Sequence, residues 1–439
     1  TALEGTWSAT PDAYTYEWFQ SVTSGAIGTG KELVVPAGAL GTTLTVKVTA
    51  TKLGHSSATA SSDPTAAVAA GGLSNTAKPA ITGEVKVGST LTASEGSWSP
   101  GTQDTYTFTY RWFQAGKADP IGTAKSLEIP AGALGKALTV EVTAIKPGYG
   151  NSTATSEATA PVAAGTFTNA TLPTITGAVK VGGTVTAVEG GWTPAAGSYL
   201  YQWFQDGTPI ADATAKTLVV PASALDKKLT VEVTARKIGY QNKAATSDPT
   251  AAVALGDLTN DGAPTITGTV QVGKQVSAGN GTWSATPDSY TYRWFQDGTA
   301  TPIGTGKNLV VPAGAAGRAL TVEVTAKAPA YHDGVATSAP SGAVALGDLV
   351  NNTAPSVSGT AQVGKTLTAN PGTWTPAPAA DGFAYQWFQD GTPIPDATGK
   401  QLVVPASAEG RTLTVEVTAT VDGYAPSSVE SVGTGAVVP

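Results

Sequence analysis

The sequence YQWFQ at residues 201–205 decides the fold, because a close variant of it occurs five times along the chain. Each variant has the pattern Tyr-x-Trp-Phe-Gln, and the spacing of about 90 residues fits one small β-sandwich better than a helical or leucine-rich repeat. The tryptophans of the pattern are Trp18, Trp112, Trp203, Trp294 and Trp387. Each copy of the repeat is therefore expected to have a hydrophobic core of its own.

The residues on both sides of this pattern are typical of β-strands. In LTVEVTA at residues 229–235, apolar and polar residues alternate, which is the period of a strand with one buried face. Similar short runs are separated by Gly, Pro, Asn and Asp, and no run of comparable length has a convincing helical period. The chain is thus predicted to be all-β, built from tandem β-sandwich domains arranged as an elongated rod.

Turn residues mark the ends of these strands. Asp-Gly follows the tryptophan strand at residues 206–207, 297–298 and 390–391, and glycine there accepts the positive φ of a tight turn. A proline closes a later apolar run in every copy, because a residue without an N–H can stop a ladder of hydrogen bonds but cannot continue it. These prolines are Pro36, Pro130, Pro221, Pro312 and Pro405. A short corner into the next strand is expected after each of them.

The repeat divides the chain into five predicted domains, which we call copies 1 to 5. Their boundaries are residues 1–73, 74–167, 168–258, 259–349 and 350–439. Thr1 aligns with Thr92 of copy 2, so copy 1 lacks its opening strand. Either the array continues upstream of residue 1, or a strand from another chain fills the gap.

The tryptophan strand supplies both the predicted core and a candidate contact surface. The tryptophan of the pattern is expected to be the central core residue of its copy, with the tyrosine two positions earlier on the same face. The adjacent phenylalanine then points to the opposite face, where it is either covered by neighbouring side chains or forms a repeated contact for another chain or a ligand. These candidate contact residues are Phe19, Phe113, Phe204, Phe295 and Phe388.

The whole repeat resembles a known family. The succession Val-Gly, Leu/Val-x-Ala, Gly-x-Trp, Tyr-x-Trp-Phe-Gln, Val-x-Val-Thr-Ala and Gly-Tyr is similar to the tandem immunoglobulin-like repeats of bacterial surface proteins, actinobacterial ones especially. The resemblance covers essentially the entire chain and implies immunoglobulin-like sandwiches. It says little about role, because such repeats serve as spacers on adhesins, wall-attached enzymes and phage particles. The chain has no Cys, so the disulfide of antibody-type domains is absent.

Two further residues recur in every copy and have alternative interpretations. A second tryptophan follows a glycine near the end of an early strand, where it either caps one end of the sandwich or stacks on a sugar ring. These are Trp7, Trp98, Trp192, Trp283 and Trp374. A lysine precedes the proline run, and we favour a turn lysine with its ammonium group in water over the isopeptide cross-link of Gram-positive fibres. These are Lys31, Lys125, Lys216, Lys307 and Lys400.

Metal binding and catalysis find little support in the sequence. Two junctions carry oxygen donors that could bind calcium, namely Asp257, Asn260, Asp261, Asp348 and Asn351, but the first two junctions offer no carboxylate. His55 and His332 each belong to a single copy, so a catalytic triad would have to arise in one repeat while the others stayed inert. We therefore expect no enzyme activity, no catalytic or metal-binding residue and no cofactor.

Composition narrows the possible partners. The net charge is −7 over 439 residues and no basic patch is present, which argues against nucleic acid as a partner. The longest apolar runs are far shorter than the roughly 20 residues of a membrane-spanning helix, so these residues are not expected to insert into a bilayer. Other protein chains, and as an alternative polysaccharide, remain as partners.

The sequence therefore predicts a non-enzymatic structural stalk or adhesive fibre of a bacterial surface or secreted protein. Two alternatives stay open, a structural protein of a phage particle or extracellular filament, and a carbohydrate-binding repeat array. All three place the chain outside a cell, at a cell surface or on a phage particle.

Overall fold

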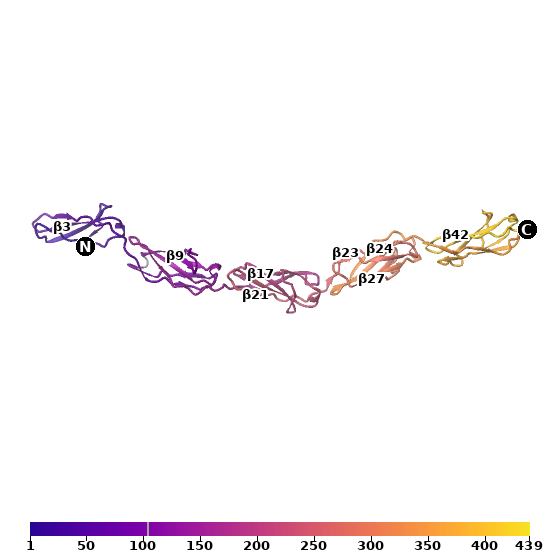
Figure 1. The fold of residues 1–439 in the computed structure, drawn as a ribbon, viewed down its shortest axis with the longest axis horizontal. Coiled ribbons are helices and arrows are strands. Elements are labelled where there is room, and N and C mark those ends of the chain that lie inside the picture. The colour runs from indigo at the N-terminus through magenta and orange to yellow at the C-terminus, as the bar shows by residue number, and fades with distance from the viewer. Residues whose placement is uncertain (103–104) are drawn as a thin grey trace. The chain divides into compact units, whose positions relative to one another are not determined.

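The structure is a computed structural model that describes residues 1–102 and 105–439. The chain divides into two compact units, one of residues 1–174, 188–202 and 231–248, the other of residues 175–187, 203–230 and 249–439. Strands and short 3-10 turns make up the regular structure of both units, and no α-helix occurs in the described residues (Figure 1). The prediction of an all-β fold is confirmed.

Copy 2 lies within the first unit and has the two packed sheets of an immunoglobulin-like sandwich. One sheet has the order β10-β7-β6 and the other the order β12-β11-β9, while a separate pair joins β5 to β8. The strands are β5 (Ser74–Ala77), β6 (Ile81–Thr82), β7 (Thr90–Ala93), β8 (Ser97–Ser99), β9 (Thr107–Gln114), β10 (Ser126–Glu128), β11 (Leu138–Ile145) and β12 (Ser152–Thr155). Side chains from both sheets form one core around Trp112.

Copies 4 and 5 lie within the second unit and repeat this arrangement. In copy 4 the sheet orders are β24-β25-β28 and β27-β29-β31, with the pair β23-β26. Its strands are β23 (Asn260–Gly262), β24 (Thr265–Gly268), β25 (Gln275–Gly279), β26 (Thr282–Trp283), β27 (Ser289–Gln296), β28 (Asn308–Val310), β29 (Leu320–Lys327) and β31 (Gly334–Thr337). In copy 5 the orders are β34-β35-β39 and β38-β37-β40-β42, with the pair β33-β36. Its strands are β33 (Val350–Thr353), β34 (Ser356–Ser358), β35 (Thr366–Asn370), β36 (Thr373–Thr375), β37 (Phe383–Gln389), β38 (Thr392–Pro393), β39 (Gln401–Val403), β40 (Leu413–Ala419) and β42 (Ser427–Glu430).

The strands of copy 3 are shared between the two units. In the first unit β13 pairs with β16 and β20 pairs with β21. In the second unit β15 pairs with β19 and β17 pairs with β18. Their bounds are β13 (Thr168–Thr171), β14 (Thr174–Gly177), β15 (Thr184–Val188), β16 (Gly191–Thr193), β17 (Ser198–Gln205), β18 (Thr208–Pro209), β19 (Thr217–Val219), β20 (Leu229–Arg236) and β21 (Lys243–Thr246). The division into five domains with the predicted boundaries stays a prediction.

Copy 1 has one sheet, in the order β2-β1-β3-β4. Its strands are β1 (Ala13–Gln20), β2 (Gly28–Thr29), β3 (Leu44–Thr51) and β4 (Ala58–Ser61). β1 and β3 pair along their whole length, with Trp18 opposite Val46. The tryptophan strand therefore pairs in the same way as in copy 2, where Trp112 lies opposite Val140.

The alternating strand predicted from residues 229–235 has one buried face in every copy. In β11 the residues Leu138, Val140, Val142 and Ala144 are fully buried, and the threonine and glutamate residues between them face outward. Valine and threonine suit such strands because their branched side chains pack well on a pleated surface. The buried face of this strand, together with the tryptophan opposite it, forms the centre of the core.

A short 3-10 turn follows each recurring proline, at the position where the sequence predicts a corner. The turns are η1 (Ala37–Ala39), η3 (Ala131–Ala133), η4 (Ala222–Ala224), η5 (Ala313–Ala315) and η6 (Ala406–Ala408). The preceding proline has φ of −74° to −76°, the value that its ring imposes. The third residue of each turn is a buried alanine, so the corner packs against the core.

Candidate functional site

The tryptophans of the repeated pattern are buried in every copy. Trp112, Trp203, Trp294 and Trp387 have no exposed surface, and Trp18 is 7% exposed. Each indole Nε1 donates a hydrogen bond to a backbone carbonyl twelve residues further on, at 2.8–3.0 Å. The indole thus fills the core and satisfies its one polar group, as a buried tryptophan requires.

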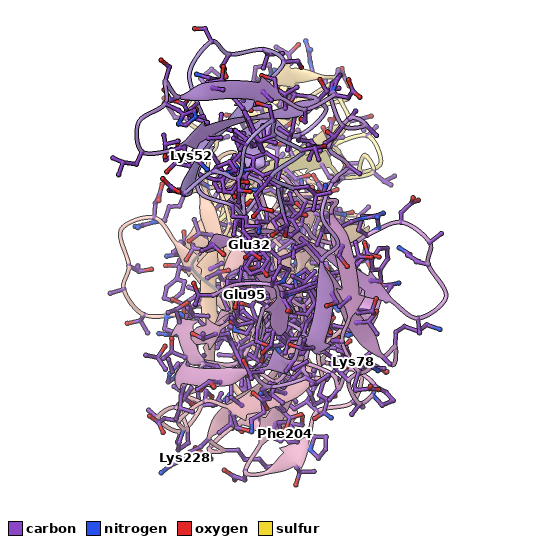
Figure 2. All side chains as sticks on the ribbon, turned by 90° about the vertical axis from the view of Figure 1, so that its left-hand side faces the viewer. Glu32, Lys52, Lys78, Glu95, Phe204 and Lys228 are labelled. Atoms are coloured by element: carbon purple, nitrogen blue, oxygen red, sulfur yellow. The ribbon has the colours of Figure 1, made fainter. Side chains whose placement is uncertain are left out.

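The five candidate contact phenylalanines are half-buried rather than fully exposed. Phe19, Phe113, Phe204, Phe295 and Phe388 all have this intermediate exposure. Arg111 lies over the ring of Phe113 at 5.1 Å, and Arg293 lies over Phe295 at 5.2 Å. Phe204, labelled in Figure 2, pairs across strands with Pro209. Each ring keeps one accessible part, and its role as a contact stays a proposal.

The second tryptophan closes the end of its copy. Trp98, Trp192 and Trp374 are at most 9% exposed, which leaves little ring face for a sugar. Each packs against the apolar residue that ends the preceding copy, as Trp192 does against Phe167 with an edge-to-face geometry at 6.2 Å. The Nε1 of each second tryptophan donates to the carbonyl three residues earlier. The capping interpretation therefore fits these contacts better than a sugar platform.

The recurring lysine forms a surface ion pair where a glutamate is available. The Lys125 Nζ lies 2.5 Å from Glu95, which Figure 2 labels, and the Lys31 Nζ lies 2.5 Å from Glu4. Glu95 also accepts a hydrogen bond from the Tyr110 hydroxyl at 2.9 Å. Burial raises the pKa of Tyr110 to about 12, and the hydrogen bond to Glu95 adds to this shift. The side chains of Lys31 and Lys125 are about half exposed, as expected for turn lysines.

Four of the five junction oxygen donors, Asp257, Asn260, Asp348 and Asn351, form other contacts. Asp257 pairs with Lys180 at 2.6 Å, and this hydrogen bond lowers the pKa of the Asp257 carboxyl. Asp348 accepts a hydrogen bond from Gln271 at 3.1 Å. Asn260 and Asn351 each donate to two backbone carbonyls, as Asn75 and Asn169 do at the other junctions. No group of three or more acidic or histidine side chains suited to a metal occurs in the part of the chain that the structure describes.

The feature that the sequence interpretation missed is a joint between consecutive copies. Four tyrosines in the turn after the alternating strand form parallel bridges with a glycine in the linker that precedes their own copy. The pairs are Gly71 with Tyr149, Gly165 with Tyr240, Gly256 with Tyr331 and Gly347 with Tyr424. In each pair the linker glycine N–H donates to the carbonyl of the residue before the tyrosine, at 2.9–3.0 Å. We call this the Gly–Tyr joint.

The linker glycine is required because the tyrosine ring lies directly against it. A Cβ on Gly256 would lie 2.5 Å from the Tyr331 ring, and a Cβ on Gly347 would lie 2.5 Å from the Tyr424 ring. Distances under 3.0 Å are not tolerated, so any larger residue would push the ring away. Glycine at these positions is therefore explained by close approach of the backbone to an aromatic ring.

The residue before each tyrosine has a positive φ, and where it is glycine it faces the preceding copy. Gly239 has φ of +83° and Gly423 has φ of +79°. A Cβ on Gly239 would lie 2.8 Å from the Ala131 Cβ, and a Cβ on Gly423 would meet Ala313 equally closely. Ala131 and Ala313 begin the 3-10 turns of copies 2 and 4. The turn therefore sits against the corner of the copy before it.

The tyrosine itself reaches the Val-Gly turn of the preceding copy. The Tyr331 hydroxyl would lie 2.7 Å from a Cβ on Gly182, and the Tyr424 hydroxyl 3.2 Å from a Cβ on Gly273. Tyr240 approaches Gly88 in the same way. We call the Val-Gly turn and the first alanine of the 3-10 turn the acceptor surface of a copy.

The joint between copies 1 and 2 is less complete than the others. Copy 1 supplies no Val-Gly turn, and a cavity of about 140 Å³ lies beside Tyr149, lined in part by Val35 and Leu40. In copy 1 itself His55 stands where the later copies have tyrosine, and it is exposed. A Cβ on the preceding Gly54 would meet nothing within 4 Å.

Comparisons with known proteins find structural likeness only at low similarity. No protein-family model matches the sequence, and no curated protein matches it. Sidekick-1 immunoglobulin domains 1–5 match at 14% identity over 98% of this chain and 92% of that chain, with a TM-score of 0.21. A Ca²⁺-stabilised adhesin with which an Antarctic bacterium binds ice matches at 14% identity over 92% and 95%, with a TM-score of 0.27.

A tetra-tandem repeat from the extending region of a large adhesion protein also matches, at 17% identity over 84% of this chain and 100% of that chain, with a TM-score of 0.25. These values are too low to assign a family or a role. The immunoglobulin-like class therefore rests on the sheets described above, and the resemblance to actinobacterial repeats stays a prediction. Among the described residues, no helix has the length and apolar character needed to cross a membrane.

Proposed function

We propose that this chain is a non-enzymatic structural stalk or adhesive fibre of a bacterial surface or secreted protein. The observation that carries the proposal is the Gly–Tyr joint, which occurs four times with the same backbone bridge. A flexible linker would leave neighbouring domains free to reorient, whereas a joint with fixed contacts keeps them in register. A chain that makes the same joint at every junction is suited to keeping its two ends a fixed distance apart.

The partners of such a stalk are other protein chains at a surface. The half-buried phenylalanines offer one apolar contact in each copy, which suits lateral packing or a surface partner. Polysaccharide is a weaker candidate, because three of the second tryptophans are buried. A structural protein of a phage particle or extracellular filament uses the same joints and remains the alternative. In either case the chain acts outside a cell, at its surface or on a particle.

Small-angle X-ray scattering of the full chain tests the proposal. Five sandwiches of about 30–40 Å joined end to end give a maximum dimension of roughly 150–200 Å, with the scattering of a stiff particle. Gly256→Val would displace Tyr331 from its joint and should give a broader range of dimensions, while Gly72→Val is the matched control because its Cβ would meet nothing within 4 Å. A compact particle, or a wild-type chain as flexible as the Gly256 variant, would contradict the proposal.

A further inference from the structure

Tyr424 belongs to copy 5 but packs against the core of copy 4. It lies on the buried cluster of copy 4 around Trp294, which includes Val272 of the acceptor surface. Tyr240 of copy 3 packs in the same way on the cluster around Trp112 of copy 2, which includes Val87. In both cases the end of the core that contains the Val-Gly turn is covered by an aromatic ring from the next copy along the chain.

The contacts of Tyr424 with its own copy are of a different kind. It touches the small end cluster that Trp374 and Ala419 of copy 5 form with Leu349, the last residue of copy 4. The main core of copy 5, around Trp387, is formed by other described residues and does not include Tyr424. The same side chain is thus part of the main core of the preceding copy and only of the end cap of its own copy.

We propose that each acceptor surface is a docking site for the Gly–Tyr turn of the following copy, and that this turn completes the main core of the copy that receives it. The coupling free energy between the two copies is reciprocal, but the main core that the ring covers belongs to the receiving copy, so local loss of protection is expected there when the ring is removed. This inference does not rest on the role as a stalk, because it concerns only how one copy recognises the next.

The physical reason is the surface that the ring covers. Val272 is 2% exposed with Tyr424 in place, and loss of the ring would open it and the neighbouring turn to water. Removing a packed aromatic side chain costs the transfer energy of the ring and leaves a cavity that the surroundings fill only partly. In a chain of repeats such interface contributions add to the stability of each unit.

Amide hydrogen exchange of the full chain, followed by mass spectrometry, tests which main core loses protection when the ring is removed. Tyr424→Ala should increase exchange about tenfold in β25, β28 and residues 270–274 of copy 4, and leave β35 and β39 of copy 5 within about twofold of wild type. Tyr424→Phe keeps the ring and should retain most of the protection of copy 4. Faster exchange confined to copy 5, or a phenylalanine variant as unprotected as the alanine variant, would overturn the proposal.

His55→Ala is the matched control. It changes the equivalent position in copy 1, where His55 is exposed and a Cβ on the preceding Gly54 would meet nothing within 4 Å, so exchange should change only around the turn itself. Tyr240→Ala repeats the test at another joint and should expose β7 and β10 of copy 2. If that variant leaves copy 2 fully protected, the coupling is not a general property of the joint and the proposal fails. A stalk whose joints hold the copies together without completing the preceding core would still pass the scattering test, so the two proposals can fail separately.

Discussion

Copies 1 and 2 share the same tryptophan strand but differ in what covers it. In copy 2 the sheet β10-β7-β6 lies over the inner face of β9 and β11, whereas the strands of copy 1 form a single sheet. Ile129 of copy 2, just before the recurring proline, is 1% exposed, while Val35 at the same position of copy 1 is 45% exposed. Ile129 directly follows β10, which pairs with β7 in copy 2, whereas residues 31–36 of copy 1 form no strand.

The difference teaches which parts of the repeat form independently of the second sheet. Trp18 keeps the indole hydrogen bond to Gly30 at 3.0 Å, as Trp112 does to Ala124 at 2.9 Å. The pairing of the tryptophan strand with the alternating strand is also the same in both copies. Burial of the apolar residues before the proline, in contrast, depends on the second sheet. The pairing thus follows from local pattern, and the closed core needs both sheets.

The largest effect is expected from truncating these two residues as a matched pair. Ile129→Ala should cost about 2–5 kcal/mol, because it removes fully buried methyl groups and leaves a cavity. Val35→Ala should cost less than about 1 kcal/mol, because nearly half of the side chain is already in water. Hydrogen exchange of β9 and of β1 in the two variants measures both effects. Equal losses of protection in the two copies would mean that the exposure difference has no energetic consequence.

Much of this comparison could be predicted from the sequence. The Tyr-x-Trp-Phe-Gln pattern, the alternation in residues 138–144 and the recurring prolines predict the strands and corners that the structure has. These features can be predicted because each is set by residues close together in the sequence. The period of a strand and the fixed φ of proline are examples. The missing opening strand of copy 1 is also visible from alignment alone, since Thr1 aligns with Thr92.

The Gly–Tyr joint could not be predicted in the same way, because its two halves are far apart in sequence. Gly165 and Tyr240 are each ordinary loop residues until a fold brings the ring against the backbone. A signal existed, in that a linker glycine and a Gly-Tyr or Ala-Tyr pair recur together at four junctions. The sequence likewise offers Asn260 and Asn351 as calcium donors, but in the structure their amides donate to backbone carbonyls. Residue type alone does not distinguish an asparagine that binds a metal from one that donates hydrogen bonds to the backbone.

A smaller effect is expected at the joint between copies 1 and 2, where two adjacent glycines provide the test. Gly71→Ala should cost about 1–3 kcal/mol, because its Cβ would lie 2.5 Å from the Tyr149 ring and force the ring to move. Gly72→Ala should stay within about 0.5 kcal/mol of wild type, because its Cβ would meet nothing within 4 Å. Thermal unfolding of the full chain, with exchange of residues 146–150 as a local probe, separates the two. Comparable destabilisation by both variants would point to linker flexibility rather than ring contact.

The smallest effect concerns the tyrosine next to the core of copy 2. Burial raises the pKa of Tyr110 to about 12, with a further contribution from its hydrogen bond to Glu95. Because the folded pKa lies above that of the unfolded chain, the neutral hydroxyl is favoured by folding. Its stabilising contribution is complete below about pH 10 and is lost as the pH rises through about 12.

The pKa of Tyr201 is also raised to about 12, so absorbance titration near 295 nm should show an amplitude near pH 12 that is reduced by one tyrosine in Tyr110→Phe. The accompanying loss of stability at about pH 11 should be below about 1 kcal/mol, because this group is partly solvated and charges near the surface are screened. Lys125→Met is the informative partner variant, since it removes the cation that shares Glu95 with Tyr110. Without the lysine the negative charge of the Glu95 carboxylate next to Tyr110 is uncompensated. The pKa of the Tyr110 hydroxyl should therefore rise further. A downward shift would show that the lysine does not act on Tyr110 through Glu95, and the cluster would then be a set of separate contacts.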